Sequence, residues 1–401
     1  MLTKGFHLTY CTNIHPGESW ADTFANLRQY IPKIKAACSP DQAFGIGLRS
    51  SHEASLELIK PEKLKEFKEW LQESDCYVFT FNGFPYGGFH RQVVKDEVHQ
   101  PDWSTKERLE YTLRLFDILE ALLPEGMDGG ISTSPLSYRH WHQDAAAMER
   151  VFEKSTLHLV QVAEKLFNIY QETGKVLHLD IEPEPDGILE NTAEVIAYFK
   201  EYLIPQGAPY LADKIGISRE AAELCLKNHI RICYDVCHFA VVYEKPAEVF
   251  AALEAEGIQI GKIQISAALK LKLDQTNPQQ TAQYLAPFSE STYLHQVVAR
   301  CDSGKLVSYK DLPEALSSFN NEEEEWRVHF HVPVFLSDYG SIASTQEDIL
   351  EVLLQLRSNP VTNHLEVETY TWEVLPEAIN LDLAGSIIRE LQWVNDNLLE
   401  K

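Results

Sequence analysis

The chain has 401 residues, of which 35 are Lys or Arg and 60 are Asp or Glu, so its formal net charge is −25. Such an acidic surface repels phosphate backbones and anionic lipids, which argues against a general nucleic-acid binder and against a protein held to membranes by charge. A hydrophobic fraction of 44% is that of a folded globular protein. The length suits two average domains or one large α/β barrel with insertions.

The amino terminus, MLTKGFHLTYC, lacks the basic segment, apolar run and small-residue cleavage site of a signal peptide. No stretch approaches the roughly 18–20 consecutive apolar residues of a membrane helix, so we expect no integral membrane segment. The seven cysteines are scattered and none forms a CxxC pair. We therefore expect a cytoplasmic protein with reduced thiols, whose oligomeric state the sequence does not indicate.

Short apolar runs rich in β-branched and aromatic residues alternate with longer segments of helical period, which is the pattern of βα units and a parallel sheet. Nine runs predict strands, one more than a closed eight-stranded barrel uses. In chain order they are residues 6–10, 44–48, 77–81, 130–133, 176–181, 230–234, 261–265, 328–335 and 364–368.

Three segments between these strands carry clear helix signals. The sequence STKE at 104–107 matches a capping box, in which Ser104 and Glu107 satisfy backbone amides at a helix start. Apolar residues at helical spacing follow it until Pro124. A long helix is predicted over about 144–173, ending at a glycine, and another over 347–356.

The extra strand falls in the long stretch between the seventh and last predicted strands. The first half of this stretch is polar and weakly periodic, which predicts an insertion of about 270–335 after the seventh strand. We expect 326–335 to be an extra extended element and 364–368 to be the eighth strand, although the reverse assignment stays open. The prediction is one α/β domain, a TIM (β/α)8 barrel, over residues 1–401.

Active sites of such barrels form at the carboxyl ends of the strands. Acid or amide side chains stand there on four successive predicted strands, namely Glu182, Asp235, Gln264 and Glu368. Carboxylates gathered in a cavity of low dielectric constant repel one another unless a cation lies between them. The pattern predicts a site for a divalent metal such as Mg²⁺ or Mn²⁺, and the nearby His238 would also suit Co²⁺ or Zn²⁺.

Polar and aromatic side chains also follow the first four strands, and we predict that they contact a substrate: His15, Arg49, Asn82, Tyr86, His90, Arg139 and His142. Glycines let the loop after the third strand bend tightly, and its aromatic side chains could line a pocket for a ring or a terpenoid-like chain. A purely structural aromatic loop is the alternative. No GxGxxG or P-loop motif supports nucleotide binding.

A Glu after the fifth strand, Asp-x-x-His at the sixth and a Glu at the eighth resemble the xylose-isomerase-like barrels of the sugar isomerase and epimerase superfamily. The resemblance implies that Glu182, Asp235 and Glu368 bind one divalent metal, which polarises substrate oxygens while flanking carboxylates move a proton between adjacent carbons. It implies catalytic roles for Glu182, Glu368 and His238.

The sequence departs from that pattern at one ligand, since the superfamily has a His on strand seven where this chain has Gln264. An amide oxygen can bind Mg²⁺ or Mn²⁺ but suits Zn²⁺ less well than an imidazole. In the segment 328–335, His329 and His331 alternate with apolar residues and face one side. We expect one of them, His331, to reach the mouth as a metal ligand. A purely structural place for both is the alternative.

Two loops resemble a narrower family. Residues 10–18 (YCTNIHPGE) and 81–90 (FNGFPYGGFH), followed by VK at 94–95 and PDW at 101–103, are similar to the metabolite traffic protein EboE family. That family belongs to the same superfamily and is associated with gene clusters that move or process secondary metabolites. The resemblance implies a cytoplasmic barrel with a small-molecule site and supplies no reaction.

Two functions remain open from the sequence. The first is a divalent-metal-dependent isomerase, epimerase or related lyase acting on a small polyhydroxylated or aromatic metabolite. The second is a non-catalytic metabolite-binding or traffic protein that retains the barrel pocket. Action on abasic DNA, which the superfamily resemblance would also allow, is opposed by the net charge of −25.

Overall fold

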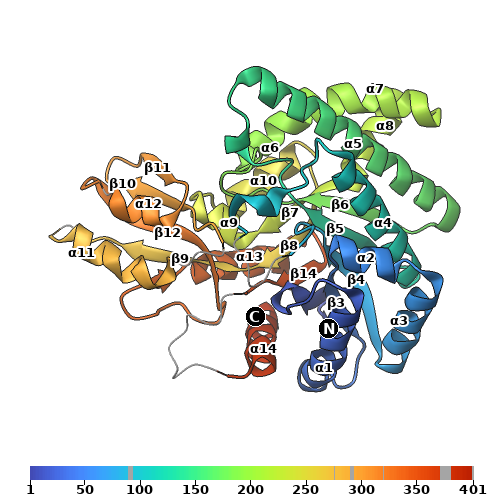
Figure 1. The fold of residues 1–401 in the computed structure, drawn as a ribbon, viewed down its shortest axis with the longest axis horizontal. Coiled ribbons are helices and arrows are strands. Elements are labelled where there is room, and N and C mark those ends of the chain that lie inside the picture. Colours follow the sequence, from blue (N-terminus) through green and yellow to red (C-terminus); the bar gives the residue numbers. More distant parts are fainter. Residues whose placement is uncertain (89–93, 275, 290–292, 319, 371–380, 400–401) are drawn as a thin grey trace.

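The computed structural model describes residues 1–88, 94–274, 276–289, 293–318, 320–370 and 381–399 (Figure 1). One sheet contains eight parallel strands in the order β2-β14-β8-β7-β6-β5-β4-β3, with the short antiparallel β1 (Leu2–Thr3) beside β2. A parallel bridge between Cys11 and Gly47 joins the two ends of this order. The eight strands therefore form an α/β barrel, as the alternating pattern predicts.

The barrel strands agree with the predicted runs to within one residue at almost every end. They are β2 (Phe6–Tyr10), β3 (Phe44–Arg49), β4 (Cys76–Asn82), β5 (Gly129–Thr133), β6 (Leu177–Ile181), β7 (Ile230–Asp235), β8 (Ile260–Ile265) and β14 (His364–Val367). Of the two assignments left open for the last strand, the structure has β14 in the barrel, paired with β8 and β2.

Helices surround the barrel, as Figure 1 shows. They are α1 (Trp20–Cys38), α2 (His52–Leu58), α3 (Pro61–Glu73), α4 (Lys106–Leu122), α5 (Ala145–Thr173), α6 (Thr192–Tyr198), α7 (Ile204–Ile215), α8 (Arg219–His229), α9 (Val236–Val241), α10 (Pro246–Ala255), α13 (Gln346–Ser358) and α14 (Leu383–Leu399). Side chains alternate along each strand, so Leu179, Ile263 and Leu365, all fully buried, face these helices while their neighbours face the barrel interior.

Two of the predicted helices, α5 and α13, begin and end within two residues of the predicted positions, but the predicted capping box does not form. The Asp144 side chain accepts from the Ala147 amide at the start of α5, which confirms that helix. Helix α4 instead begins one residue later than predicted, with Thr105 as its cap. Ser104 is not the cap because the Asp102 carboxylate accepts hydrogen bonds from both its hydroxyl and its backbone amide, at 2.6 and 3.0 Å.

The barrel interior contains a buried ion pair. Lys262 Nζ donates to Glu366 Oε2 at 2.7 Å and to Ser132 Oγ at 3.0 Å, and both charged side chains are fully buried. A Cβ at Gly47 would lie 1.9 Å from Glu366 Oε1, so only glycine leaves room for this carboxylate. The pair places a positive charge beneath the acidic carboxyl mouth of the barrel.

A second sheet, entirely antiparallel, follows β8 and precedes β14 along the chain. Its order is β11-β10-β12-β9-β13, and it lies beside the barrel in Figure 1. Its strands are β9 (Ala267–Lys272), β10 (Val297–Cys301), β11 (Leu306–Tyr309), β12 (Glu323–Val332) and β13 (Ala343–Ser344), with the short helices α11 (Pro278–Ala282) and α12 (Leu312–Ser317). Strand β12 contains the predicted extended segment up to Val332.

All seven cysteines lie in the described ranges and none is in a disulfide. Within those ranges, we find no helix that combines the length and the apolar character needed to span a membrane.

Candidate metal centre

Three carboxyl groups converge at the carboxyl mouth of the barrel. Glu182 follows β6, Asp235 ends β7 and Glu368 follows β14, and their exposed fractions are 3%, 0% and 4%. Each offers an oxygen within 4.8 Å of the other two. The backbone fixes two of them, because the Glu182 amide bonds the Thr133 carbonyl and the Glu368 amide bonds the Ile265 carbonyl. The geometry thus brings together the acids that the sequence places at strand ends.

Burial and mutual repulsion act strongly on these groups. Burial, reinforced by Glu368 and Asp235, raises the pKa of Glu182 well above its ordinary value. Burial and Asp235 likewise raise the pKa of Glu368. Although burial opposes ionisation, His238 and His331 hold the pKa of Asp235 below its ordinary value. The three acids can all be ionised together only with a cation between them.

Hydrogen bonding leaves acceptor atoms of the acids open. Ser266 Oγ and the His238 amide donate to Asp235 Oδ1, at 2.6 and 3.1 Å. Asn13 and Asn82 donate their side-chain amides to Glu368 Oε1, at 2.6 and 3.0 Å. Asp235 Oδ2 and Glu182 Oε2 have no hydrogen-bond partner within the part of the chain that the structure describes. These buried lone pairs suit a bound cation.

Two histidines face each other beside Asp235. His238 Nδ1 lies 3.0 Å from the Pro183 carbonyl, and His331 Nδ1 lies 3.0 Å from the Glu368 carbonyl. A carbonyl only accepts, so each Nδ1 carries a hydrogen, and a ring without a second proton has its lone pair at Nε2. These two Nε2 atoms are 3.4 Å apart. Ligands on a tetrahedral Zn²⁺ at about 2.0–2.1 Å are separated by about 3.4 Å, so the spacing fits a shared metal.

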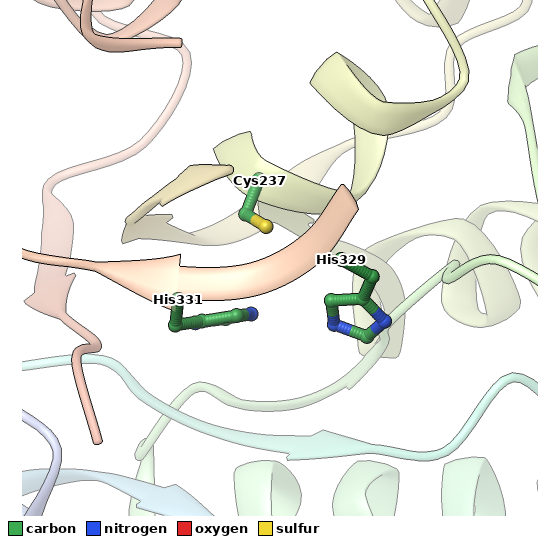
Figure 2. Close-up of side chains that lie close together, drawn as sticks. All are labelled: Cys237, His329 and His331. Carbon is green, nitrogen blue, oxygen red and sulfur yellow. The ribbon is translucent and has the colours of Figure 1, made fainter. Parts of the chain in front are cut away.

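Strand β12 of the second sheet supplies His331 and its neighbour His329, both shown in Figure 2. His329 Nδ1 donates to Gln296 Oε1 at 2.8 Å, because Gln296 uses its amide nitrogen on the Pro185 carbonyl. His329 also groups with His238 and Glu184, with ligand atoms within 4.8 Å. The mouth therefore offers imidazoles from both the barrel and the second sheet.

Cys237 on α9 is a poorer ligand. Its sulfur lies within 4.8 Å of ligand atoms of His329 and His331. Burial and Asp235 raise the pKa of the thiol well above its ordinary value, so the sulfur stays protonated in this environment. A metal would therefore have to displace this proton before the sulfur could bind it.

A cavity of about 610 Å³, including its opening, lies over this group. Its walls combine apolar rings, amides and charged groups: Asn13, Asn82, Phe84, Pro85, Lys95, Val98, His99, Glu182, Glu184, His238, Tyr293, Leu294, Gln296, His329, His331, Glu368 and Tyr370. Of the predicted substrate contacts, Asn82 is in this set.

Four other predicted substrate contacts have partners outside the cavity wall. Arg49 is 3% exposed and binds Glu18 through both carboxylate oxygens. His15 bonds the Tyr10 hydroxyl. Arg139 pairs with Glu194, and His142 lies 2.9 Å from Ser137 Oγ. Proximity to a strand end in sequence does not reveal that such a group already has a protein partner.

Of the remaining predicted site residues, two lie outside the cavity wall and one is not among the described residues. Tyr86 stacks on His52 with ring centroids 4.5 Å apart and lines a separate pocket. Gln264 is fully buried, and its Oε1 accepts from the Cys233 thiol at 3.2 Å, so the structure places it outside the cavity wall. His90 lies outside the described residues.

Several residues of the cavity wall are not among the site residues predicted from the sequence. Glu184 stands two residues after Glu182, and its Oε1 lies 3.0 Å from His99 Nε2. The repeated EPEP sequence at 182–185 is a signal that could have found it. His99 and Gln296 come from distant loops and carry no local signal, since only the fold brings them to the mouth.

No protein-family model and no curated protein matches the sequence. Among solved structures, a xylose isomerase-like TIM barrel protein from Mycobacterium smegmatis in complex with magnesium is similar, with 11% identity, coverage of 98% of this chain and 96% of that one, and a TM-score of 0.49. The IolI protein with a binding zinc atom has 12% identity, covers 98% of each chain and has a TM-score of 0.46.

The probable 3-DHS dehydratase AsbF of petrobactin synthesis from Bacillus anthracis is also similar, with 11% identity, 96% and 97% coverage and a TM-score of 0.42. These similarities are too distant to assign a family or a function. The barrel is established by the strand pairing of this chain itself.

Proposed function

We propose that the protein is a divalent-metal-dependent enzyme of the sugar isomerase or epimerase type, acting on a small polyhydroxylated or aromatic metabolite. The observation that carries the proposal is the convergence of three buried carboxyl groups, Glu182, Asp235 and Glu368, on two imidazoles under one cavity. Mixed carboxylate and imidazole donors suit Mn²⁺, Co²⁺ or Zn²⁺, while Mg²⁺ would use the oxygens alone.

Asp235, His331, Glu182 and Glu368 would hold the metal. In this proposal His331, carried by β12, takes the place of the strand-seven imidazole of the xylose-isomerase-like barrels. Support comes from its Nδ1 contact with the Glu368 carbonyl and from its Nε2, which faces His238 in a group that includes Asp235. A bound divalent ion would polarise a carbonyl or hydroxyl oxygen of the substrate.

The two glutamates differ in the role that their surroundings favour. Glu368 Oε1 is held by two amide donors, Asn13 and Asn82, which fix it as an acceptor. Glu182 Oε2 has no hydrogen-bond partner among the described residues and lines the cavity, so Glu182 is the better group to move a proton to or from a bound substrate. His238, anchored on the Pro183 carbonyl, would ligate the metal or assist that transfer.

The cavity wall indicates the class of substrate. Phe84, Pro85 and Tyr370 offer apolar contact, while Glu182 Oε2 and His329 Nε2, which have no hydrogen-bond partner among the described residues, can bond hydroxyl groups. A metabolite with both a ring or apolar part and hydroxyl groups fits this mixture. The similarity of loops 10–18 and 81–103 to the EboE family is consistent with a secondary metabolite and rests on those motifs alone.

We treat residues 1–401 as one domain in this proposal, with the second sheet as an insertion in the seventh βα connection. Support comes from β12, which brings His329 and His331 to the mouth. It also comes from Gln296, which precedes β10 and donates to the Pro185 carbonyl in the segment after β6. A site that draws ligands from both sheets would not form from the barrel alone.

Metal analysis after dialysis tests the proposal. The wild type is expected to retain a divalent metal at the mouth that Glu182→Gln and Asp235→Asn lose. Glu390→Gln is a matched control, because Glu390 is also a buried carboxyl, 2% exposed, but accepts hydrogen bonds from Val334 and Thr369 and belongs to no group of candidate ligands. A mouth that binds no added Mn²⁺, Co²⁺ or Zn²⁺, or binds it equally in Asp235→Asn, would contradict the proposal.

The alternative is a non-catalytic metabolite-binding or traffic protein with the same pocket. The observation that favours it is the absence of an imidazole on β8, where Gln264 bonds Cys233 instead. Mass spectrometry of the purified protein distinguishes the two functions. A co-purified metabolite that stays unchanged on prolonged incubation with added metal supports binding alone, whereas any conversion supports the enzyme.

A further inference from the structure

The amino ends of the barrel strands hold a second group of ligand-type side chains, which we call the base cluster: Asp128, His178 and His364. Asp128 precedes β5, His178 is the second residue of β6 and His364 is the first of β14. Each offers a ligand atom within 4.8 Å of the others. The cluster is distinct from the mouth, because the four residues from His178 to Glu182 along β6 span about 13 Å.

His178 is oriented as metal-binding histidines are. Its Nδ1 lies 2.6 Å from Asp180 Oδ1, and both side chains are fully buried. When Nδ1 donates to this carboxylate, Nε2 turns its lone pair toward Asp128, whose Oδ2 is 3.8 Å away. Among the described residues, Nε2 has no hydrogen-bond partner. A carboxylate that orients the far side of an imidazole is the usual companion of a metal ligand.

His364 completes the geometry. It is fully buried, and neither of its ring nitrogens has a hydrogen-bond partner in the described ranges. Its Nε2 lies 3.3 Å from Asp128 Oδ1, close to the separation of about 3.4 Å between two ligands of a tetrahedral Zn²⁺.

Two glycines of the surrounding strands leave room for the side chains of this cluster. A Cβ at Gly261 would lie 1.8 Å from Asp180 Oδ1, and one at Gly130 would lie 2.3 Å from His178 Cε1. Both positions therefore need glycine for the pair to fit. Arg231, a nearby cation, interacts with Asp180 and Asp128 and bonds the Asn228 carbonyl.

We propose that Asp128, His178 and His364 bind a Zn²⁺-type divalent ion, with a fourth position open to water beside Asp128, whose side chain is 29% exposed. Two imidazoles and one carboxylate favour Zn²⁺ or Co²⁺ over Mg²⁺. The ligands come from the beginnings of β5, β6 and β14, and β5 and β14 are four strands apart in the barrel order. The ion would tie together strands on opposite sides of the base, as a structural clip.

The test uses the full chain in the Glu182→Gln/Asp235→Asn background, which disables the mouth and so separates this proposal from the proposed function. After chelation and dialysis, Zn²⁺ alone is titrated into the protein. The background variant is expected to bind about one equivalent and to melt a few degrees higher with Zn²⁺. With Co²⁺ instead, it is expected to show the visible absorption of a tetrahedral site.

Adding Asp128→Asn or His364→Gln to the background is expected to abolish the stoichiometric binding, the Zn²⁺-dependent rise in melting temperature and the Co²⁺ absorption. Asp128 is at the rim, so its amide variant keeps the fold even where the buried His364 variant does not. His229→Gln is the matched control, because His229 is a buried histidine at the same end that bonds the Leu177 carbonyl. It is expected to leave binding unchanged.

A folded background variant that takes up no Zn²⁺, or whose uptake is unaffected by Asp128→Asn, overturns the proposal. In that case a shared proton would stabilise the cluster instead of a metal. Nitrogen NMR of His178 would then show both ring nitrogens protonated, with no change on adding Zn²⁺.

Discussion

The two ends of the barrel hold the same kinds of side chain in different settings. At the mouth, three acids lie beside two imidazoles, under a cavity of about 610 Å³ that includes its opening. The acids are Glu182, Asp235 and Glu368. At the base, a single partly exposed acid, Asp128, faces two fully buried imidazoles. The mouth is therefore suited to a metal that shares its coordination with a substrate, and the base to one that is held by protein ligands and water.

The origin of the ligands differs as well. The mouth takes His331 from the second sheet, whereas the base cluster comes from the barrel and the residue just before β5. A site that depends on an additional sheet can change with that sheet, while a site made of strand starts is fixed by the barrel. The following experiments test this contrast, from the largest expected effect to the smallest.

Replacing Lys262 by Met is expected to have the largest effect, because this lysine lies in the barrel interior between the two ends. The change leaves the fully buried Glu366 without its cation at 2.7 Å. Breaking one partner of a buried pair costs about 3–5 kcal/mol of unfolding free energy, measurable by urea denaturation. The double variant Lys262→Met/Glu366→Leu is expected to recover most of the loss. A single variant as stable as the wild type would show that the pair does not support the barrel.

Glu390 is a buried carboxyl that belongs to neither candidate metal site, so it shows how burial alone affects an acid in this protein. Burial raises its pKa from 4.5 to about 8. Between these pH values the folded protein keeps this proton while the unfolded chain releases it, so the contribution of Glu390 to stability falls as the pH rises. Glu390→Gln is expected to gain a few kcal/mol in unfolding free energy relative to wild type at pH 8.5, and to gain little at pH 4.5. A stability difference that does not change with pH would contradict this.

His331→Gln separates the mouth from the base. Loss of the imidazole is expected to weaken metal binding at the mouth by at least about 10-fold and to leave the base cluster unchanged. Competition with a chromogenic chelator measures the affinity, and Asp128→Asn should give the reciprocal result. His142→Gln is the control, because His142 lies beside Ser137 outside the cavity wall. Equal affinity in His331→Gln and wild type would remove His331 from the ligand set.

The strand-end acids could be predicted because alternation and strand order fix where side chains such as Glu182 and Glu368 emerge. That the histidine pair of the added segment lies near the mouth could be predicted as well, since the seventh strand lacks an imidazole, but the choice between His329 and His331 could not. The base cluster could not be predicted, because active sites of such barrels form at the carboxyl ends of the strands and no local pattern marks ligands at their amino ends. The acidic partners of Arg49 and Arg139 could not be predicted, because Glu18 lies in another loop and Glu194 in helix α6, at positions that no local pattern reveals.

Arg139→Ala is expected to have the smallest effect and tests that last distinction. Arg139 donates to Glu194 at 2.7 Å, and both side chains are about one-third exposed, at 34% and 31%. Water screens such a pair, so its loss should change the unfolding free energy by no more than about 1 kcal/mol. Metal content at both ends should match the wild type. A marked loss of metabolite binding with unchanged stability would instead return Arg139 to the substrate site and extend the mouth beyond the cavity wall, toward the loop that follows the fourth strand.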